Sequence, residues 1–390
     1  MAENEAMRGI YVHIPFCSRK CGYCDFYSVV GGEEDLRGYG TLVVRELETV
    51  LRFYPGEARI PADTVYFGGG TPTVLGPDRL CRLLGEIRGL VPVAEGAEIT
   101  VEANPGTVTE EDLCRLREGG FTRLSLGVQS FHPPTLRMLG RIHTAGEADA
   151  AFRDARKAGF RSVGLDLMFG IPAQEAETWR GDLRHAVAIA PDHLSAYALS
   201  PEPGTPLHAQ IARAATTLPP DDAVARMYDT ARELLSSAGY RHYEISNFAR
   251  PGRECQHNGK YWDRAGYLGL GPSAHGLLFP GEHAPLGLRT ANPPALRDYA
   301  RRLGEGRLPW ISSDASRPED AWKEFLILGL RRECGVSLPE GEKRYGLPPG
   351  EVRKAVEDLT GSGALIRDGS RIRIPGPLWF VSNEVLHRFA

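Results

Sequence analysis

The stretch Tyr11-Val-His-Ile-Pro-Phe-Cys17-Ser-Arg-Lys-Cys21-Gly-Tyr-Cys24 places three cysteines directly after a short run with strand character. The C-x3-C-x2-C spacing lets three thiolates converge on one metal centre, and thiolates favour zinc or an iron–sulfur cluster. A structural zinc site normally has four protein ligands. No fourth Cys or His lies close by, because His13 belongs to the strand. Three thiolates on a [4Fe–4S] cluster leave one iron open to a small molecule.

Composition narrows the class of protein. The 390 residues carry 46 Lys+Arg and 50 Asp+Glu, a net charge of −4, which excludes a polyanion-binding protein driven by bulk charge. Seven cysteines in a chain of this length do not make a disulfide framework. The first ten residues lack the apolar run of a secretory signal, and no apolar run is long enough for a membrane anchor. We therefore expect a cytoplasmic protein with reduced thiols.

Strand-like and helix-like segments alternate along the first 200 residues. Such alternation predicts βα units and a parallel sheet. Right-handed crossovers can close that sheet into a full or partial barrel, and an open doubly wound sheet fits equally well. We expect strands at Gly9–Ile14, Thr64–Phe67, Glu98–Glu102, Arg123–Gly127, Ser162–Leu167 and His193–Leu199, and helices at Leu36–Phe53, Asp78–Leu90, Glu110–Glu118, Gly146–Ala158 and Ala176–Ala188.

Most of these strands end in a polar or Gly-rich signature, and the carboxyl ends of parallel strands are where sites are built. Beyond residue 200 the pattern changes: we expect a helix at Asp222–Ala238, a strand at Tyr240–Asn247 and a Gly-rich stretch at Gly252–Gly276. We divide the chain into a core at 1–200, an extension at 201–300 and a small C-terminal domain at 311–390.

The C-terminal domain resembles a winged helix. Helices are expected at Pro318–Arg332 and Pro349–Gly361, followed by a hairpin of Ala364–Arg367 and Arg371–Ile374. From Ile311 onward the chain has twelve basic and twelve acidic residues, so nothing in its charge favours binding to nucleic acid.

The cysteine spacing is similar to that of the radical S-adenosylmethionine (SAM) enzymes, and further motifs resemble the oxygen-independent coproporphyrinogen III oxidase family within them. The resemblance implies a partial (β/α)6 radical-SAM barrel with a small C-terminal winged-helix-like domain, a [4Fe–4S] cluster and SAM. The motifs run in order along nearly the whole chain: Tyr11–Cys17, Gly68-Gly-Gly-Thr-Pro-Thr73, Glu102-Ala-Asn-Pro105, Gly127-Val-Gln-Ser130, Gly140-Arg-Ile-His143 and Asp166-Leu-Met-Phe-Gly-Ile-Pro172.

By that resemblance Cys17, Cys21 and Cys24 would hold the cluster. Gly70 and Thr71 would approach the SAM amino-acid moiety, because a Gly-rich turn lets backbone N–H groups come close to a carboxylate. Glu102 would accept hydrogen bonds from SAM. The remaining implied site residues complete a polar ring or line the site: Tyr11, Gln129, Arg141, Asp166 and Ala198.

The family divides into two branches. Coproporphyrinogen dehydrogenases carry a further cysteine two places after the third, where this chain has Phe26, so oxidative decarboxylation of propionate side chains becomes the alternative function. The HemW-type heme chaperones form the other branch. His257-Asn258-Gly-Lys-Tyr261-Trp262 matches their H-N-x-x-Y-W motif, which makes His257 the heme-ligand candidate. Cys255, two residues earlier, is a second candidate ligand that rests on the C-x-H spacing alone.

The leading hypothesis is therefore a heme chaperone on a radical-SAM scaffold, which binds heme and transfers it to acceptor proteins. The resemblance extends the expected partners to membrane-associated respiratory proteins. Productive cleavage of SAM is left open, and so is the choice between monomer and dimer.

Overall fold

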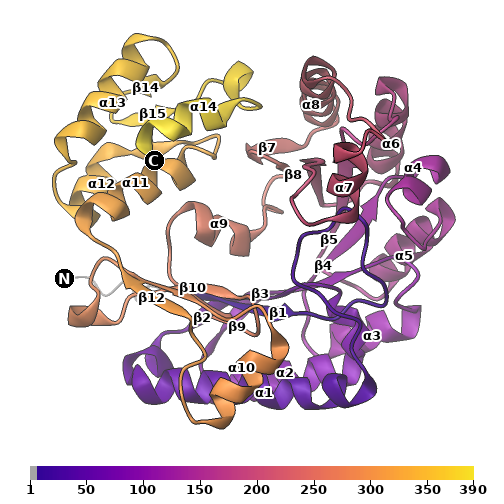
Figure 1. The fold of residues 1–390 in the computed structure, drawn as a ribbon, viewed down its shortest axis with the longest axis horizontal. Coiled ribbons are helices and arrows are strands. Elements are labelled where there is room, and N and C mark those ends of the chain that lie inside the picture. The colour runs from indigo at the N-terminus through magenta and orange to yellow at the C-terminus, as the bar shows by residue number, and fades with distance from the viewer. Residues whose placement is uncertain (1–6) are drawn as a thin grey trace.

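The computed structural model describes residues 7–390, and six parallel strands form its centre (Figure 1). Residues 1–6, which contribute to the expectation of no secretory signal, lie outside the described residues. Each strand predicted for the first 200 residues is present. Their bounds are β1 Arg8–Ile14, β2 Ala62–Gly69, β3 Val93–Ala103, β4 Arg123–Gln129, β5 Ser162–Phe169 and β6 His193–Ala198.

The order of the strands decides between the two architectures that the alternation left open. β1 to β6 lie side by side in chain order, whereas a doubly wound sheet reverses its order part-way. Every crossover therefore runs in the same direction, and the helices cover the outer face of a curved sheet (Figure 1). These helices are α1 Glu33–Phe53, α2 Pro77–Leu90, α3 Glu110–Glu118, α4 Pro133–Met138, α5 Ala145–Lys157 and α6 Ala176–Ile189. The predicted partial (β/α)6 barrel is confirmed.

The two faces of β1 show how the sequence builds this barrel. Ile10, Val12 and Ile14 are fully buried in the main core, where the apolar face of α1 also lies. Because side chains alternate along a strand, Tyr11 and His13 point to the opposite, concave side. The concave side is thus lined by polar and aromatic groups that can serve a site.

Further strands extend the sheet at both edges to a total of twelve. Within the described chain, the two strands at its ends do not pair with each other. β9 pairs parallel to β1, and β8 pairs antiparallel to β6. The predicted strand Tyr240–Asn247 is in fact two antiparallel strands. The added strands are β7 Arg241–Glu244, β8 Asn247–Ala249, β9 Tyr267–Leu270, β10 His275–Leu278, β11 Leu288–Ala291 and β12 Ser312–Ala315; the added helices are α7 Pro206–Ala212, α8 Asp221–Ser237, α9 Gln256–Trp262 and α10 Leu296–Gly304.

The C-terminal domain has the expected winged-helix order of elements. Its three-stranded sheet runs β13-β15-β14, and ion pairs from Glu324 to Arg264 (2.6 Å) and Arg289 (3.0 Å) join it to the barrel. Within residues 7–390 no helix combines the length and apolar character needed to span a bilayer. The domain comprises α11 Pro318–Gly329, β13 Val336–Ser337, α12 Leu338–Tyr345, α13 Gly350–Gly361, β14 Ile366–Asp368, β15 Arg371–Arg373 and α14 Ser382–Leu386.

Candidate functional site

A cleft of 400 Å3 opens at the carboxyl ends of the parallel strands, and we call it the cysteine cleft. All three cysteines of the C-x3-C-x2-C loop line it, together with residues from the ends of β2 to β6. The sequence predicted nine other site residues. Seven of them stand in the wall of this cleft, and an eighth lines a neighbouring cleft. The seven in the wall are Gly70, Thr71, Glu102, Gln129, Arg141, Asp166 and Ala198.

A chain of polar contacts runs around the cleft from one cysteine to another. The Thr71 hydroxyl donates to Cys17 Sγ at 3.5 Å, and Asn104 Nδ2 donates to Thr71 Oγ1 at 2.8 Å. Arg141 then contacts Asn104 Oδ1, and its Nη1 donates to Cys21 Sγ at 3.6 Å. The guanidinium therefore places a positive charge beside the sulfur of Cys21. Asn104 was not predicted as a site residue, although it lies in the quoted Glu102-Ala-Asn-Pro105 motif.

Two partly buried carboxyl groups, those of Glu102 and Asp166, line the cleft. Glu102 accepts from the Tyr66 hydroxyl at 2.6 Å and from the Gly69 N–H at 3.2 Å, and burial raises its pKa to about 7. Asp166 accepts from Ser125 Oγ at 3.2 Å, and burial raises its pKa as well. Neither carboxyl makes an ion pair within hydrogen-bond reach among the described residues, so both are available to polar groups of a ligand.

The backbone N–H groups of Gly70 and Thr71 are not free to meet a carboxylate, contrary to the expectation from the Gly-rich turn. Their backbone N–H groups are occupied, donating to Ile14 O at 2.8 Å and Phe16 O at 2.7 Å. A Cβ on Gly70 would lie 2.7 Å from Phe16 O and 3.1 Å from Cys17 Sγ. Glycine at position 70 therefore lets the cysteine loop pass close to the end of β2, rather than offering a free N–H to a carboxylate.

Three further predicted residues differ in their placement. Ala198 ends β6 and lines the cleft, and Gln129 lines it with a φ of 68°, a left-handed conformation that a residue other than glycine rarely adopts. Tyr11 does not line the cysteine cleft. Its hydroxyl contacts His13 Nδ1 at 3.0 Å, and its ring lines a neighbouring cleft. Tyr11 lies in the middle of β1, whereas the cysteine loop begins after the strand ends at Ile14. The spacing of residues along the strand did not predict this difference.

The three cysteines share one cleft but do not yet converge. Among residues 7–390, no three Cys, His, Asp or Glu side chains are close enough together to hold a metal ion. All three thiols are partly exposed, and all belong to the short loop between β1 and α1. Soft sulfur donors on a single short loop fit an iron–sulfur cluster.

His257 lies in helix α9, not in a loop, and is 1% exposed. Its Nδ1 is 2.8 Å from Thr64 Oγ1 and its Nε2 is 2.9 Å from the Tyr261 hydroxyl. Burial lowers the pKa of His257 to about 3, so the ring is neutral. Both ring nitrogens are therefore engaged by hydroxyl groups, and the role of His257 as the heme ligand, which the resemblance implied, stays a prediction.

The remaining cysteines do not form a second site. Cys255 is buried, and its thiol donates to Glu98 Oε1 at 3.5 Å. Burial raises the pKa of Cys255 to about 12, so it is a neutral thiol rather than a ligand beside His257. Cys81, Cys114 and Cys334 are only partly buried.

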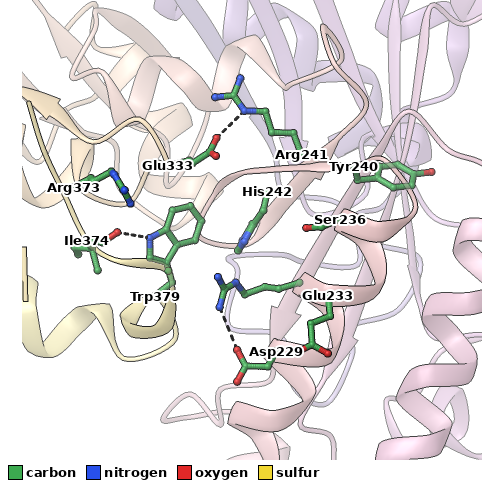
Figure 2. A pocket seen from close by; sticks show the side chains of 12 residues that line it. Asp229, Glu233, Ser236, Tyr240, Arg241, His242, Glu333, Arg373, Ile374 and Trp379 are labelled. Carbon is green, nitrogen blue, oxygen red and sulfur yellow. Dashed lines mark hydrogen bonds and ion pairs between the residues drawn. The ribbon is translucent and has the colours of Figure 1, made fainter. Parts of the chain in front are cut away.

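A separate cleft, of 580 Å3, lies where α8 and β7 face the C-terminal domain (Figure 2). The Arg241–Glu333 ion pair at 2.7 Å crosses it, and the ring of His242 meets the ring of Trp379 edge to face with 4.5 Å between centroids. None of the predicted site residues lines this cleft. We therefore treat it as the junction between the barrel and the C-terminal domain.

Comparison with known proteins agrees with this architecture. The Radical SAM superfamily model matches residues 11–186, and the HemN C-terminal domain model matches residues 317–377. Coproporphyrinogen III oxidase (HemN) from Escherichia coli has a similar structure, with a TM-score of 0.83 and 24% identity, covering 100% of this chain and 91% of that one. At this identity the likeness shows the fold alone. The fold and the cysteine cleft thus define a radical SAM protein.

The sequence relatives give the branch. The heme chaperone HemW of Bacillus subtilis is 32% identical over 98% of this chain and 99% of its own length. That of Escherichia coli is 41% identical over 70% of each chain. The chain belongs to the HemW family, as its motifs predicted.

Proposed function

We propose that this chain binds heme and transfers it to acceptor proteins, on a radical-SAM scaffold that carries a [4Fe–4S] cluster and SAM. The observation that carries the proposal is the cysteine loop. It presents three thiols to one cleft, and the position that a fourth cysteine takes in the dehydrogenases holds Phe26, whose side chain is 62% exposed. The names of the full-length relatives support the same function.

Within the cysteine cleft, Cys17, Cys21 and Cys24 would hold the cluster. In radical SAM proteins a reduced cluster supplies the electron that cleaves bound SAM. Arg141 would hold the carboxylate of SAM by charge-assisted hydrogen bonds while also facing Cys21. Glu102, with one oxygen shared between Gly69 N–H and the cleft, would accept hydrogen bonds from ligand hydroxyls. Asn104 links Arg141 to Thr71, because its side chain contacts both.

Anaerobic reconstitution with iron and sulfide tests the proposal. The reconstituted protein is expected to take up about one heme per chain and to pass it to a heme-free b-type cytochrome at a rate that rises with acceptor concentration. A rate independent of acceptor concentration would indicate passive release only. Formation of protoporphyrinogen IX from coproporphyrinogen III, with consumption of SAM, would overturn the proposal in favour of the dehydrogenase.

A variant with Cys17, Cys21 and Cys24 all changed to Ala separates the cofactors. It is expected to lose iron, sulfide and the broad cluster absorbance, while the barrel still folds because these thiols are outside the main core. Zinc in place of iron in anaerobically purified protein would contradict the radical-SAM assignment of the loop. The acceptor in the cell and the oligomeric state are separate questions for pull-down and sedimentation measurements.

A further inference from the structure

Another cleft, of 380 Å3, adjoins the cysteine cleft on the concave side of the barrel, and Asp25 and Phe26 line both. We call it the aromatic cleft. Ligand pockets in proteins commonly measure about 300–1,000 Å3 and are lined by aromatic side chains. Five aromatic side chains and one exposed histidine stand in its wall: Tyr11, Phe26, Tyr27, Tyr261, Tyr267 and His275.

His275 differs from the other two histidines on this side of the barrel. His13 and His257 each have both ring nitrogens within hydrogen-bond distance of a partner. His275 is exposed at the start of β10, and within residues 7–390 its ring has no hydrogen-bond partner. Its imidazole is therefore the one in this cleft that can bind a metal without breaking an existing contact.

The backbone around His275 is held firmly. A Cβ at Gly269 would lie 1.9 Å from His275 O, so only glycine allows β9 to pass this close to β10. Gly271, with a φ of 95°, donates its N–H to the buried carboxyl of Glu46 at 2.7 Å, and Asn292 N–H donates to Ala274 O at 2.9 Å. A ligand on such a braced turn keeps its position when a guest binds.

We propose that the aromatic cleft is the heme site, with the His275 imidazole as the axial ligand to iron and Phe26 lying against the porphyrin. The inference rests on the proposed function, because heme binding itself is inferred from the family, and the structure only locates the site. Imidazole is a common axial ligand of heme iron, and flat aromatic rings pack well against a porphyrin. The Phe26 ring is 62% exposed and lines both clefts, so it can lie against a flat ligand that enters either of them.

The shape of the cleft also suits transfer. A heme held by one histidine in an open cleft leaves its second axial position and part of its ring accessible. An acceptor protein can then bind the iron with its own ligand before the bond between the iron and His275 breaks. A heme enclosed in the barrel core beside His257 would instead require α9 to move away from β2 and β3, because Thr64 and Glu98 on these strands tie the helix in place.

Heme titration of the reconstituted full chain tests the assignment, read by the Soret band and by electron paramagnetic resonance of the ferric form. His275→Ala is expected to remove the nitrogen-ligand signature and to weaken binding roughly tenfold or more, since even groups outside a metal's ligand sphere are worth that much. His275→Met should restore binding with an altered spectrum. His283→Ala, an exposed histidine nearby that lines neither cleft, is the matched control and should leave both readouts unchanged.

Two outcomes overturn the inference. One is an unchanged spectrum and affinity in His275→Ala; the other is loss of the signature in His257→Ala when circular dichroism shows that variant to be folded. Either leaves the proposed function intact, because wild-type protein still takes up heme. If wild-type protein takes up no heme at all, the proposed function itself fails. Phe26→Ala, with its iron content unchanged, is expected to bind heme more weakly than wild type.

Discussion

His257 Nε2 lies 2.9 Å from the hydroxyl oxygen of Tyr261, one helical turn later in α9. The four-residue spacing of the H-N-x-x-Y-W motif is therefore the spacing of neighbours on one helix face. The other ring nitrogen contacts Thr64 on β2, and the ring stacks on Tyr66 with 5.1 Å between centroids. The motif thus fastens α9 into the concave face of the barrel, beneath the aromatic cleft.

Replacing His257 by Ala is expected to lower the free energy of unfolding by about 2–4 kcal/mol, because it leaves a cavity and removes the partner of the buried Thr64 hydroxyl and of the partly buried Tyr261 hydroxyl. Urea unfolding measures this directly. His283→Ala, at an exposed position, should change stability by less than about 0.5 kcal/mol. A His257→Ala protein as stable as wild type would show that the contacts of His257 with Thr64 and Tyr261 contribute nothing to the stability of the fold.

Whether a feature of the fold or of the site could be predicted from the sequence depends on how far apart along the chain the contacting residues lie. The strands β1 to β6 follow from local apolar patterns, and the clustering of Glu102 and Asp166 follows from their places on β3 and β5 near the carboxyl ends of those strands. The strand order does not follow from these patterns, and neither does the position of Arg141, which lies in the loop between α4 and α5. The environment of His257 does not, because Thr64 is 193 residues away in sequence and decides what the ring nitrogens do. Short, Gly-rich elements such as α9 and β9 carry too little periodicity to be recognised before their neighbours are known.

Acidification is expected to loosen the C-terminal domain through His242. Its ring stacks on Phe248 and meets Trp379 edge to face, and burial lowers its pKa to about 3 from an ordinary value of 6.5. Between pH 6.5 and 3 the unfolded chain binds one more proton than the folded chain. Stability that is full above pH 6.5 is therefore lost as the pH falls, by up to about 1.4 kcal/mol per pH unit.

The measurement is the unfolding midpoint between pH 7 and 4 for wild type and His242→Phe. The variant keeps the stack on Phe248 but cannot take up a proton, so its stability should fall less steeply with acid. An equal slope in the two proteins would mean that His242 is not protonated on unfolding, and His283→Ala shows the slope expected from losing an exposed histidine.

SAM affinity is expected to rise with pH through Glu102. Burial raises the pKa of this carboxyl to about 7, and only the ionised form accepts hydrogen bonds at both oxygens. If SAM binds the ionised form, its affinity should increase roughly tenfold between pH 6 and pH 8, following the ionised fraction. Glu102→Gln, which cannot ionise, should bind SAM weakly and with a smaller pH dependence. Calorimetric titration of both proteins over this range decides the point; parallel profiles would remove Glu102 from the SAM site.

Gly70→Ala should displace the cysteine loop without unfolding the barrel. The added Cβ would meet two backbone carbonyl oxygens, Phe16 O at 2.7 Å and Ile14 O at 3.0 Å, neither of which can rotate away as a side chain would. The loop that begins after Phe16 carries Cys17, so the variant is expected to bind less iron and sulfide per chain after reconstitution. Gly85→Ala is the control, because a Cβ there, in helix α2, meets nothing within 4 Å. It should keep full cluster content and gain up to about 1 kcal/mol of stability from its helix propensity. Equal iron content in the two variants would show that the cysteine loop adjusts freely, and that its close passage over Gly70 is not needed to hold the cluster.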